Sequence, residues 1–359
     1  MNYTRTLVIL APLILAGAGA VLTTACGDDS GESASATTDA ETTGGETEGA
    51  TEAATEGASG TDTAGTTTGV EPEPGPVRFI AFGDGGEGNE DQYRVAEAVE
   101  MICADKGCDF ALYLGDNFYD DGVFAVDDEQ FIDKFEMPYA DLGFRFYIAL
   151  GNHDYGAVIP DWTRSDFQIE YTQFSEKWYL PFEWYTWQIE NVQFFVFDTH
   201  RQMLGETLFE QRAWAEEEIA KSTATWKIGL SHHPYVSNGS HGNAGSYEGL
   251  SSTLLRGQNI KEFIDDFVCG QFQLYFSGHD HNRQWLEPVC GTTFIVSGAA
   301  AKTTDLERRD ENPTFFEDAD VEGFMWVEIV GDQMTGVFYD KDGNLDFEKT
   351  ITRAEAAGG

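Results

Sequence analysis

The chain has 359 residues, with 21 Lys and Arg against 63 Asp and Glu, so its formal net charge at pH 7 is −42. A surface this acidic repels phosphate backbones and anionic lipid headgroups, which excludes non-specific binding to nucleic acid. Hydrophobic residues at 41% and aromatic residues at 13% are sufficient for a packed core. The length permits one large domain or two small ones.

Residues 1–26 predict an export signal. Arg5 precedes an apolar run from Leu7 to Leu22, which suits a signal-peptide core and is short for a spanning helix of roughly 20 residues. Small residues and then Cys26 follow, which resembles a bacterial lipoprotein signal with Cys26 as the lipidation site. Ordinary secretory cleavage and an uncleaved anchor are the alternatives. We expect a lipid-anchored protein of the bacterial cell envelope, or otherwise a periplasmic or secreted one.

Residues 27–76 are predicted to be a disordered tether. They are almost wholly Gly, Ser, Thr, Ala, Glu and Asp, with 12 acidic residues and no Lys, Arg or aromatic residue. Such a segment cannot bury enough apolar surface to offset its ordering entropy, and its like charges swell the coil. Residues 77–359, the expected catalytic domain, keep 51 acidic and 20 basic residues, a net charge of −31. Membrane contact is expected only through the N-terminal anchor.

The expected domain begins with alternating strands and helices. Strands are predicted over residues 77–83, 110–114 and 146–150, and a helix over residues 92–104. Further along, the pattern predicts paired strands over residues 187–189 and 194–197 with a turn near Asn191, and then a helix over residues 206–221. Three strands follow over residues 226–230, 272–276 and 294–296, and a closing hairpin over residues 325–330 and 335–339. Early βαβ units before a strand-rich end predict an α/β sandwich with mixed sheets.

Four cysteines lie in the expected domain, at Cys103, Cys108, Cys269 and Cys290. An even number in an exported domain favours disulfides over free thiols. Local pairing, Cys103 with Cys108 and Cys269 with Cys290, is the preferred one of three connectivities. A zinc site is the rival, but the spacing contains no CxxC pair.

Polar residues follow five of the predicted strands, usually beside glycine. The five segments are Gly83-Asp-Gly-Gly86, Gly115-Asp-Asn-Phe-Tyr119, Gly151-Asn-His-Asp154, Ser231-His-His-Pro234 and Ser277-Gly-His-Asp-His281. Six of the seven histidines lie in or just after these segments, and His200 is left over as a structural or exposed residue. The carboxyl ends of strands are where α/β folds gather their chemistry. Carboxylates, an amide, a phenol and imidazoles converging there predict a site for two metal ions.

As a set, these segments resemble the calcineurin-like metallophosphoesterase superfamily. The position of Tyr119, three residues after Asp116, resembles the pattern of the purple acid phosphatases. The position of His241, nine residues after His232, resembles the pattern of their small, tartrate-resistant branch. The resemblance implies an αββα sandwich of two mixed β-sheets flanked by helices. It also implies an acid phosphatase that hydrolyses phosphomonoesters by direct attack of metal-bound hydroxide.

The same resemblance implies a role for each motif residue. Asp84, Tyr119 and His281 would hold Fe(III), and Asp116 would bridge to the second ion. The second ion would be divalent (Fe, Zn or Mn), held by Asn152, His232 and His279. His153 and His241 would contact phosphate and assist the leaving group, as the catalytic residues. A phenolate is a hard donor that favours Fe(III), which fits this division.

Several neighbouring residues are expected to have lesser roles. Ser240 stands where the family usually has an acidic residue before the second catalytic histidine. His233 is expected to support the site without binding metal, and Asp154 and Asp280 to orient their neighbours. Asn282 and Arg283 are expected on the rim.

Two other functions are open at this point. A phosphodiesterase or nucleotidase could use the same scaffold, and related folds serve as non-catalytic surface scaffolds. The intact ligand positions favour an enzyme. We expect a monomer that acts on a phosphomonoester and binds no nucleic acid.

Overall fold

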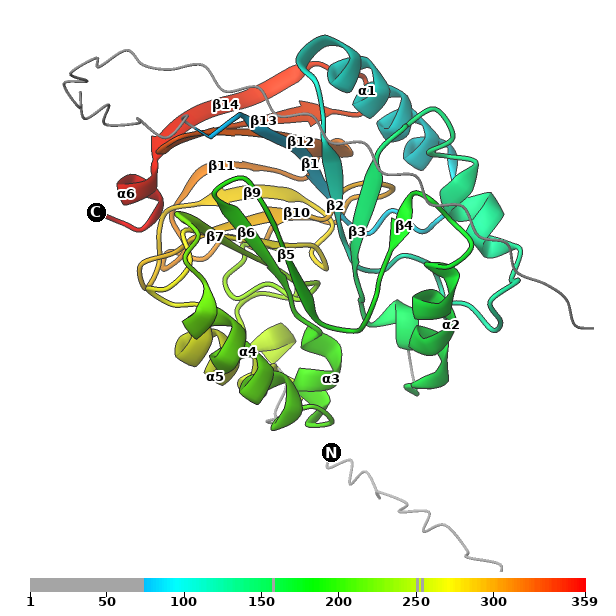
Figure 1. The fold of residues 1–359 in the computed structure, drawn as a ribbon, viewed down its shortest axis with the longest axis horizontal. Helices are drawn as coiled ribbons and strands as arrows, with labels where there is room; N and C mark the ends of the chain where they lie inside the picture. The colour runs from blue at the N-terminus through cyan, green and yellow to red at the C-terminus, as the bar shows by residue number, and fades with distance from the viewer. Residues whose placement is uncertain (1–73, 157–158, 250–251, 253–254) are drawn as a thin grey trace, which may run out of the picture. The chain divides into compact units, whose positions relative to one another are not determined.

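The computed structural model describes residues 74–156, 159–249, 252 and 255–359 (Figure 1). The predicted signal of residues 1–26, with Cys26, and nearly all of the predicted tether lie outside the described residues. Over the part of the chain that the structure describes, no helix is long and apolar enough to cross a bilayer.

Two seven-stranded sheets form the centre of the fold. The first has the order β14-β13-β12-β1-β2-β3-β4, in which β1 to β4 are parallel and β12 to β14 antiparallel. Its strands are β1 Val77–Phe82, β2 Phe110–Leu114, β3 Arg145–Ala149, β4 Trp178–Tyr179, β12 Gly323–Val330, β13 Gln333–Asp340 and β14 Leu345–Thr352.

The second sheet has the order β11-β9-β10-β8-β7-β6-β5, with β6, β7, β8 and β10 parallel. Its strands are β5 Tyr185–Ile189, β6 Val192–Val196, β7 Trp226–Leu230, β8 Leu274–Ser277, β9 Arg283–Leu286, β10 Thr293–Ser297 and β11 Thr314–Asp318. Both sheets are therefore mixed, as expected.

Helices cover the outer faces of both sheets. They are α1 Glu90–Lys106, α2 Thr163–Tyr171, α3 Thr199–Leu204, α4 Glu210–Lys221, α5 Gln258–Phe267 and α6 Arg353–Ala356, with short turns over Ile132–Glu136, His153–Tyr155 and Tyr247–Gly249. The buried face of α1 packs into the main core, whereas α4 and α5 form a second cluster on β6 and β8. The expected αββα sandwich is thereby confirmed (Figure 1).

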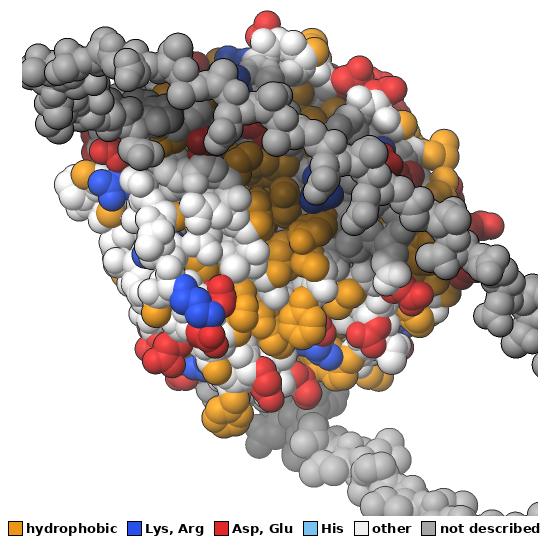
Figure 2. All heavy atoms as spheres, in the orientation of Figure 1, with side chains coloured by type: hydrophobic (Ala, Val, Ile, Leu, Met, Phe, Trp, Pro, Cys, Tyr) orange, Lys and Arg blue, Asp and Glu red, His pale blue; other side chains and the backbone are white. Residues whose placement is uncertain are grey.

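Aromatic side chains fill the space between the sheets. Phe79 on β1 meets Phe194 on β6 edge-on at a centroid distance of 5.4 Å. At the edge of the sandwich, Tyr147 on β3 stacks on Trp187 on β5 at 3.7 Å. Figure 2 shows hydrophobic side chains gathered where these two strands approach each other, with acidic side chains around them. Along β6, successive residues alternate between the two cores, with Phe194 inside and Phe195 toward α4 and α5.

The helix predicted over residues 206–221 begins four residues later in the structure, as α4, and the separate short helix α3 before it was not predicted. A short α3 ends at Gly205, whose φ of +87° suits glycine, and α4 begins only at Glu210. The expected hairpin β12–β13 is present, but a third strand, β14, extends it. That strand reads LDFEKTIT and is largely exposed, so it lacks the continuous apolar run that marks the buried strands.

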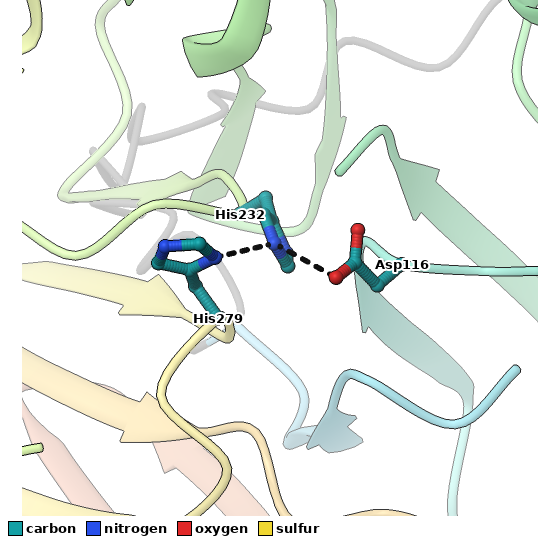
Figure 3. Close-up of side chains that lie close together, drawn as sticks. All are labelled: Asp116, His232 and His279. Carbon is teal, nitrogen blue, oxygen red and sulfur yellow. Dashed lines mark hydrogen bonds and ion pairs between the residues drawn. The ribbon is translucent and has the colours of Figure 1, made fainter. Parts of the chain in front are cut away.

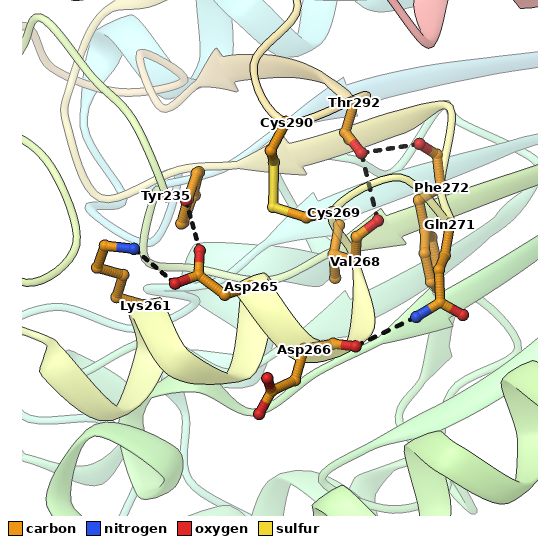
Figure 4. Close-up of a disulfide and its surroundings, with 10 residues drawn as sticks. All are labelled: Tyr235, Lys261, Asp265, Asp266, Val268, Cys269, Gln271, Phe272, Cys290 and Thr292. Atoms are coloured by element: carbon orange, nitrogen blue, oxygen red, sulfur yellow. Dashed lines mark hydrogen bonds and ion pairs between the residues drawn. A yellow bond between two sulfur atoms is a disulfide. The ribbon is translucent and has the colours of Figure 1, made fainter.

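Two disulfides join local segments. Cys103 at the end of α1 is bonded to Cys108 before β2, and Cys269 after α5 is bonded to Cys290 before β10. This is the local pairing that we preferred. Beside the second bond, the Thr292 hydroxyl donates to the Val268 and Phe272 carbonyls at 3.3 and 2.9 Å (Figure 4). The α5–β8 turn is therefore fixed covalently and by hydrogen bonds.

Candidate metal centre and active site

The carboxyl ends of strands from both sheets are joined by backbone hydrogen bonds. Asp84 N, after β1, donates to Gly115 O after β2 at 2.9 Å, and Gly83 N donates to Ser297 O of β10 at 2.8 Å. Gly278 N, after β8, donates to His232 O after β7 at 3.0 Å. The loops that carry the predicted site residues are therefore neighbours.

Two glycines allow the backbone to come very close to the carboxylates. A Cβ added at Gly151 would lie 2.2 Å from Asp116 Oδ1, and one at Gly278 would lie 2.4 Å from Asp84 Oδ2. Asp84, Asp116 and His279 also have positive φ angles of 60°, 52° and 70°. Non-glycine residues in this region store strain and cluster at functional sites.

The Tyr119 hydroxyl lies at the centre of one group of donors. It is 3.0 Å from Asp84 Oδ1, 3.0 Å from Asp116 Oδ2 and 3.1 Å from His281 Nε2. Burial, and then the Asp116 and Asp84 carboxylates, raise the pKa of Tyr119 well above its ordinary value. The phenol therefore keeps its proton unless a cation lies beside it.

His232 lies at the centre of a second group (Figure 3). Its Nε2 is 3.1 Å from Asn152 Oδ1, 3.1 Å from His279 Nδ1 and 3.3 Å from Asp116 Oδ2. Its Nδ1 is 2.9 Å from Leu114 O, so the ring is held with Nε2 toward the site. Asp116, His232 and His279 offer ligand atoms that all lie within 4.8 Å of one another.

The charges of these groups are coupled. Burial alone would lower the pKa of His232, but the Asp116 carboxylate outweighs it and raises this pKa to about 9. Burial opposes ionisation of Asp116, yet His232 and His153 hold its pKa below the ordinary value. Burial and the surrounding imidazoles lower the pKa of His279 well below its ordinary value, so its ring is neutral and available to a cation.

Both groups fit metal ions by the chemistry of their donors. Donor atoms about 3 Å apart around one point are what ligands at about 2.0–2.2 Å from a common ion require. Asp116 Oδ2 belongs to both groups, so the two groups share one carboxylate. A buried phenol between two carboxylates, and two imidazole nitrogens 3.1 Å apart, are donors that a cation would hold together.

His153 lies beside the shared carboxylate. Its backbone N donates to Asp116 Oδ1 at 2.9 Å, and its Nε2 is 4.0 Å from Asp116 Oδ2. Its Nδ1 contacts the Asp120 carbonyl, which fixes the ring with Nε2 toward the site. The imidazole can therefore reach a group bound next to Asp116.

His241 is held by a residue that the sequence analysis missed. Its Nδ1 is 2.6 Å from Glu248 Oε1, and its ring stacks on His279 at 4.1 Å. The backbones of the pair are also joined, since Glu248 N donates to His241 O at 3.0 Å. A carboxylate seven residues later thus takes the place left by Ser240, and no local pattern announces it.

Asp154 and Asp280 lie behind the site and accept backbone hydrogen bonds. Asp154 accepts from Gly151 N at 2.7 Å and Asn117 N at 3.0 Å, and mainly burial raises its pKa to about 7. Asp280 accepts from His241 N at 2.9 Å. Both therefore fix the loops that carry the proposed catalytic residues.

Two residues differ from expectation. Asn282 and Arg283 are fully buried and are not on the rim, and Arg283 is paired with Asp318 and Asp346 at 2.6 Å each. His200 is only 6% exposed. His233 is buried with its Nδ1 3.0 Å from the Thr199 hydroxyl.

Two lysines approach Tyr119 from outside the motifs. Lys302 Nζ lies 3.2 Å from the centre of the Tyr119 ring and 2.5 Å from Glu87 Oε1. Lys134 Nζ donates to the Tyr119 carbonyl. These contacts join residues distant in sequence, so periodicity and spacing give no signal for them.

Comparison with known proteins identifies the family. The model for calcineurin-like phosphoesterases matches residues 77–283, more than half of the chain. The chain therefore belongs to the calcineurin-like phosphoesterases, a family of metal-dependent hydrolases.

Curated relatives agree with the resemblance stated above. Tartrate-resistant acid phosphatase type 5 of Sus scrofa is 25% identical over 330 residues, covering 80% of this chain and 91% of the relative. Purple acid phosphatase 7 of Arabidopsis thaliana is 26% identical over 309 residues, covering 79% and 88%. The expected similarity to purple acid phosphatases of the tartrate-resistant type is confirmed.

Solved structures show the same fold. The structure described as "GAP50 the anchor in the inner membrane complex of Plasmodium" superposes with a TM-score of 0.62 at 19% identity, covering 77% of this chain and 89% of that one. PhoD superposes with a TM-score of 0.54 at 12% identity, covering 79% and 71%. These likenesses concern the fold alone.

Proposed function

We propose that the chain is an exported acid phosphatase that hydrolyses phosphomonoesters at a binuclear metal centre. The observation that carries this proposal is the pair of donor groups sharing Asp116, one centred on the Tyr119 hydroxyl and one on His232 Nε2. The names of the acid phosphatase relatives support the same activity. A non-catalytic scaffold would have no need of these strained, closely packed donors.

The two groups differ in the ions they suit. Asp84, Tyr119 and His281 would hold Fe(III), because a phenolate is a hard, anionic donor. Asn152, His232 and His279 would hold a divalent ion (Fe, Zn or Mn), because they add no charge when neutral. Asp116 would bridge them. When bound, the ions supply the charge that neutralises phosphate and makes a water nucleophilic in mild acid.

The chain's own side chains complete the site around the phosphate. His153 would donate a hydrogen bond to a phosphate oxygen, since its other nitrogen is fixed by Asp120 O. His241 would give a proton to the departing alkoxide from Nε2, with Glu248 holding Nδ1–H. No side chain is needed as a covalent nucleophile.

Export is part of the proposal. Two disulfides in the described domain support folding in an oxidising compartment. Lipidation at Cys26 remains a prediction from the sequence. Mass spectrometry of the mature N-terminus would distinguish a lipidated Cys26 from ordinary cleavage.

Metal analysis and a visible spectrum of the purified protein test the metal centre. We expect two ions per chain, at least one of them iron, and a phenolate-to-Fe(III) absorption band that Tyr119→Phe abolishes while the far-ultraviolet circular dichroism is unchanged. Full phosphatase activity without iron would overturn the Fe(III) assignment.

A substrate comparison tests the reaction. Phenyl phosphate should be hydrolysed in mild acid at least about 100-fold faster than bis-phenyl phosphate, since a diester lacks the second phosphate charge that two ions would hold. Preference for the diester would favour a phosphodiesterase. No turnover after reconstitution with iron and zinc would favour a scaffold.

A further inference from the structure

A pocket of about 280 Å³ opens beside the proposed divalent half of the site. Asn152 and His279, two of the proposed metal donors, lie on its wall, and Glu248, the partner of His241, lies there too. The remaining wall is mostly apolar and includes Pro160, Met203, Leu204, Tyr247 and Leu255. Its volume is near the lower end of about 300–1,000 Å³ for small-molecule pockets, enough for a group the size of one aromatic ring.

The position of the pocket matches where an alcohol would leave. His241 would protonate the departing oxygen, and its carboxylate partner Glu248 lines the pocket. A phosphate held between the two donor groups would therefore have its alcohol on the pocket side.

His200 is a buried polar group on this wall without a partner. It is 6% exposed, and both of its ring nitrogens are buried with no hydrogen bond to any described residue. Its ring lies between Tyr155 and His233, at centroid distances of 5.4 and 5.8 Å. Burial lowers the pKa of His200 to about 4, so the ring is neutral and offers one donor and one acceptor. Buried polar groups are normally paired, so a ligand group or a bound water that reaches this ring would satisfy it.

Charge on the pocket wall restricts what can enter. None of the described lining residues is Lys or Arg, and Glu248 adds a carboxylate. The surrounding expected domain has a net charge of −31. A second anionic group on the alcohol would therefore meet repulsion without a compensating cation.

We propose that this pocket binds the alcohol half of the substrate and that His200 is its specificity-determining residue. The substrate class is a monophosphate ester of an uncharged, ring-sized, mainly apolar alcohol that carries one hydroxyl or carbonyl hydrogen-bonded to His200. This inference rests on the proposed phosphatase function and adds the substrate's chemistry to it.

The test compares phenyl phosphate with 3- and 4-hydroxyphenyl phosphate, whose leaving groups are similar. The wild-type enzyme should prefer at least one hydroxyphenyl isomer by about three- to tenfold in kcat/KM, which is the effect of one neutral hydrogen bond. His200→Phe should remove this preference, and His200→Gln, the matched control that keeps a donor and an acceptor, should retain part of it. An unchanged preference in His200→Phe, or none in the wild type, overturns the role of His200.

A second variant tests the pocket without changing the core. Leu255 is 50% exposed at the pocket wall, so Leu255→Trp should fill the space and still fold. It should raise the KM for 1-naphthyl phosphate at least about fivefold while inhibition by inorganic phosphate stays unchanged, because phosphate alone does not reach the pocket. Equal KM values of the wild type and Leu255→Trp for 1-naphthyl phosphate overturn the pocket assignment. Loss of phosphate inhibition in the wild type would instead contradict the proposed function itself.

Discussion

A single contact between Glu248 and His241 sets the orientation of the His241 ring. The 2.6 Å approach of Oε1 to Nδ1 leaves only Nε2 of His241 free to face the site. The carboxylate therefore acts as a positioning residue, since it fixes the orientation of the ring. Its position seven residues downstream, in a turn with a φ of +50° at Glu248, is a property of this chain's own loop.

Replacing Glu248 should affect substrates unequally. Glu248→Ala should lower kcat about tenfold or more for alkyl phosphates, because their poor leaving groups need the proton, and less than about threefold for 4-nitrophenyl phosphate. Glu248→Gln, which keeps a hydrogen-bond acceptor, should lose less. Steady-state kinetics on both substrates checks this, and equal losses on the two would show that Glu248 serves only the fold.

Lys302 should tune the colour of the centre if Tyr119 binds Fe(III). An ammonium 3.2 Å from the ring centre stabilises electrons on the phenolate ring, so charge transfer out of the ring costs more energy. Lys302→Met should therefore move the absorption band to longer wavelength. Lys134→Met, which removes a contact to the Tyr119 carbonyl and not to the ring, is the matched control. A band in the same place in the wild type and Lys302→Met would contradict the cation–π contact.

At the scale of an element, the short helix α3 supplies part of the pocket wall. Asp198 caps its start by accepting from Arg201 N at 2.9 Å, and Gly205 ends it, which places His200, Met203 and Leu204 on the pocket. The Asp198 side chain also accepts a hydrogen bond from the Tyr155 hydroxyl. The position of the pocket wall therefore depends on the cap of this helix.

The buried His200 should make α3 sensitive to acid. Its pKa of about 4 is below the ordinary 6.5, because burial disfavours the charged ring more than the Asp116 carboxylate favours it. The unfolded chain thus binds the proton more tightly, and stability falls as the pH drops below 6.5. From pH 6.5 to 5 the His200 contribution should decrease by about 2 kcal/mol.

Urea unfolding of the metal-depleted wild type and His200→Gln at both pH values measures this contribution. From pH 6.5 to 5, the free energy of unfolding of the wild type should fall by about 2 kcal/mol relative to that of His200→Gln. A difference independent of pH would mean that His200 is not buried as a neutral ring.

The whole domain has a net charge of −31 while it is proposed to act on an anion. Repulsion of this kind extends over the Debye length, about 30 Å in 0.01 M salt and about 8 Å in 0.15 M. The metal ions would then act locally against an unfavourable field.

Added salt should therefore improve substrate binding and stabilise the fold. Raising NaCl from about 10 mM to about 150 mM should lower the KM for phenyl phosphate about two- to threefold and raise the melting temperature, because both self-repulsion and substrate repulsion are screened. Initial rates and thermal unfolding at the two salt concentrations check this. A KM that rises with salt would show that a local positive field dominates substrate capture.

Much of the fold follows from local pattern. Continuous apolar runs gave the bounds of β2 and β7 as predicted, since buried parallel strands are apolar on both faces. The exposed β14 and the short helix α3 were missed, because an edge strand and a capped short helix leave weak periodicity. The residues that gather around Asp116 could be predicted because each follows a strand directly.

By itself, the sequence determined which side chains stand at the strand ends, and hence the chemistry of the candidate centre, because chain connectivity alone places them there. Only the tertiary structure decided what surrounds them. Lys302 meets Tyr119, Glu248 meets His241 and His200 enters a pocket through contacts between separate loops. Such contacts depend on how two sheets and their loops pack in space, and packing has no periodic signature along the chain.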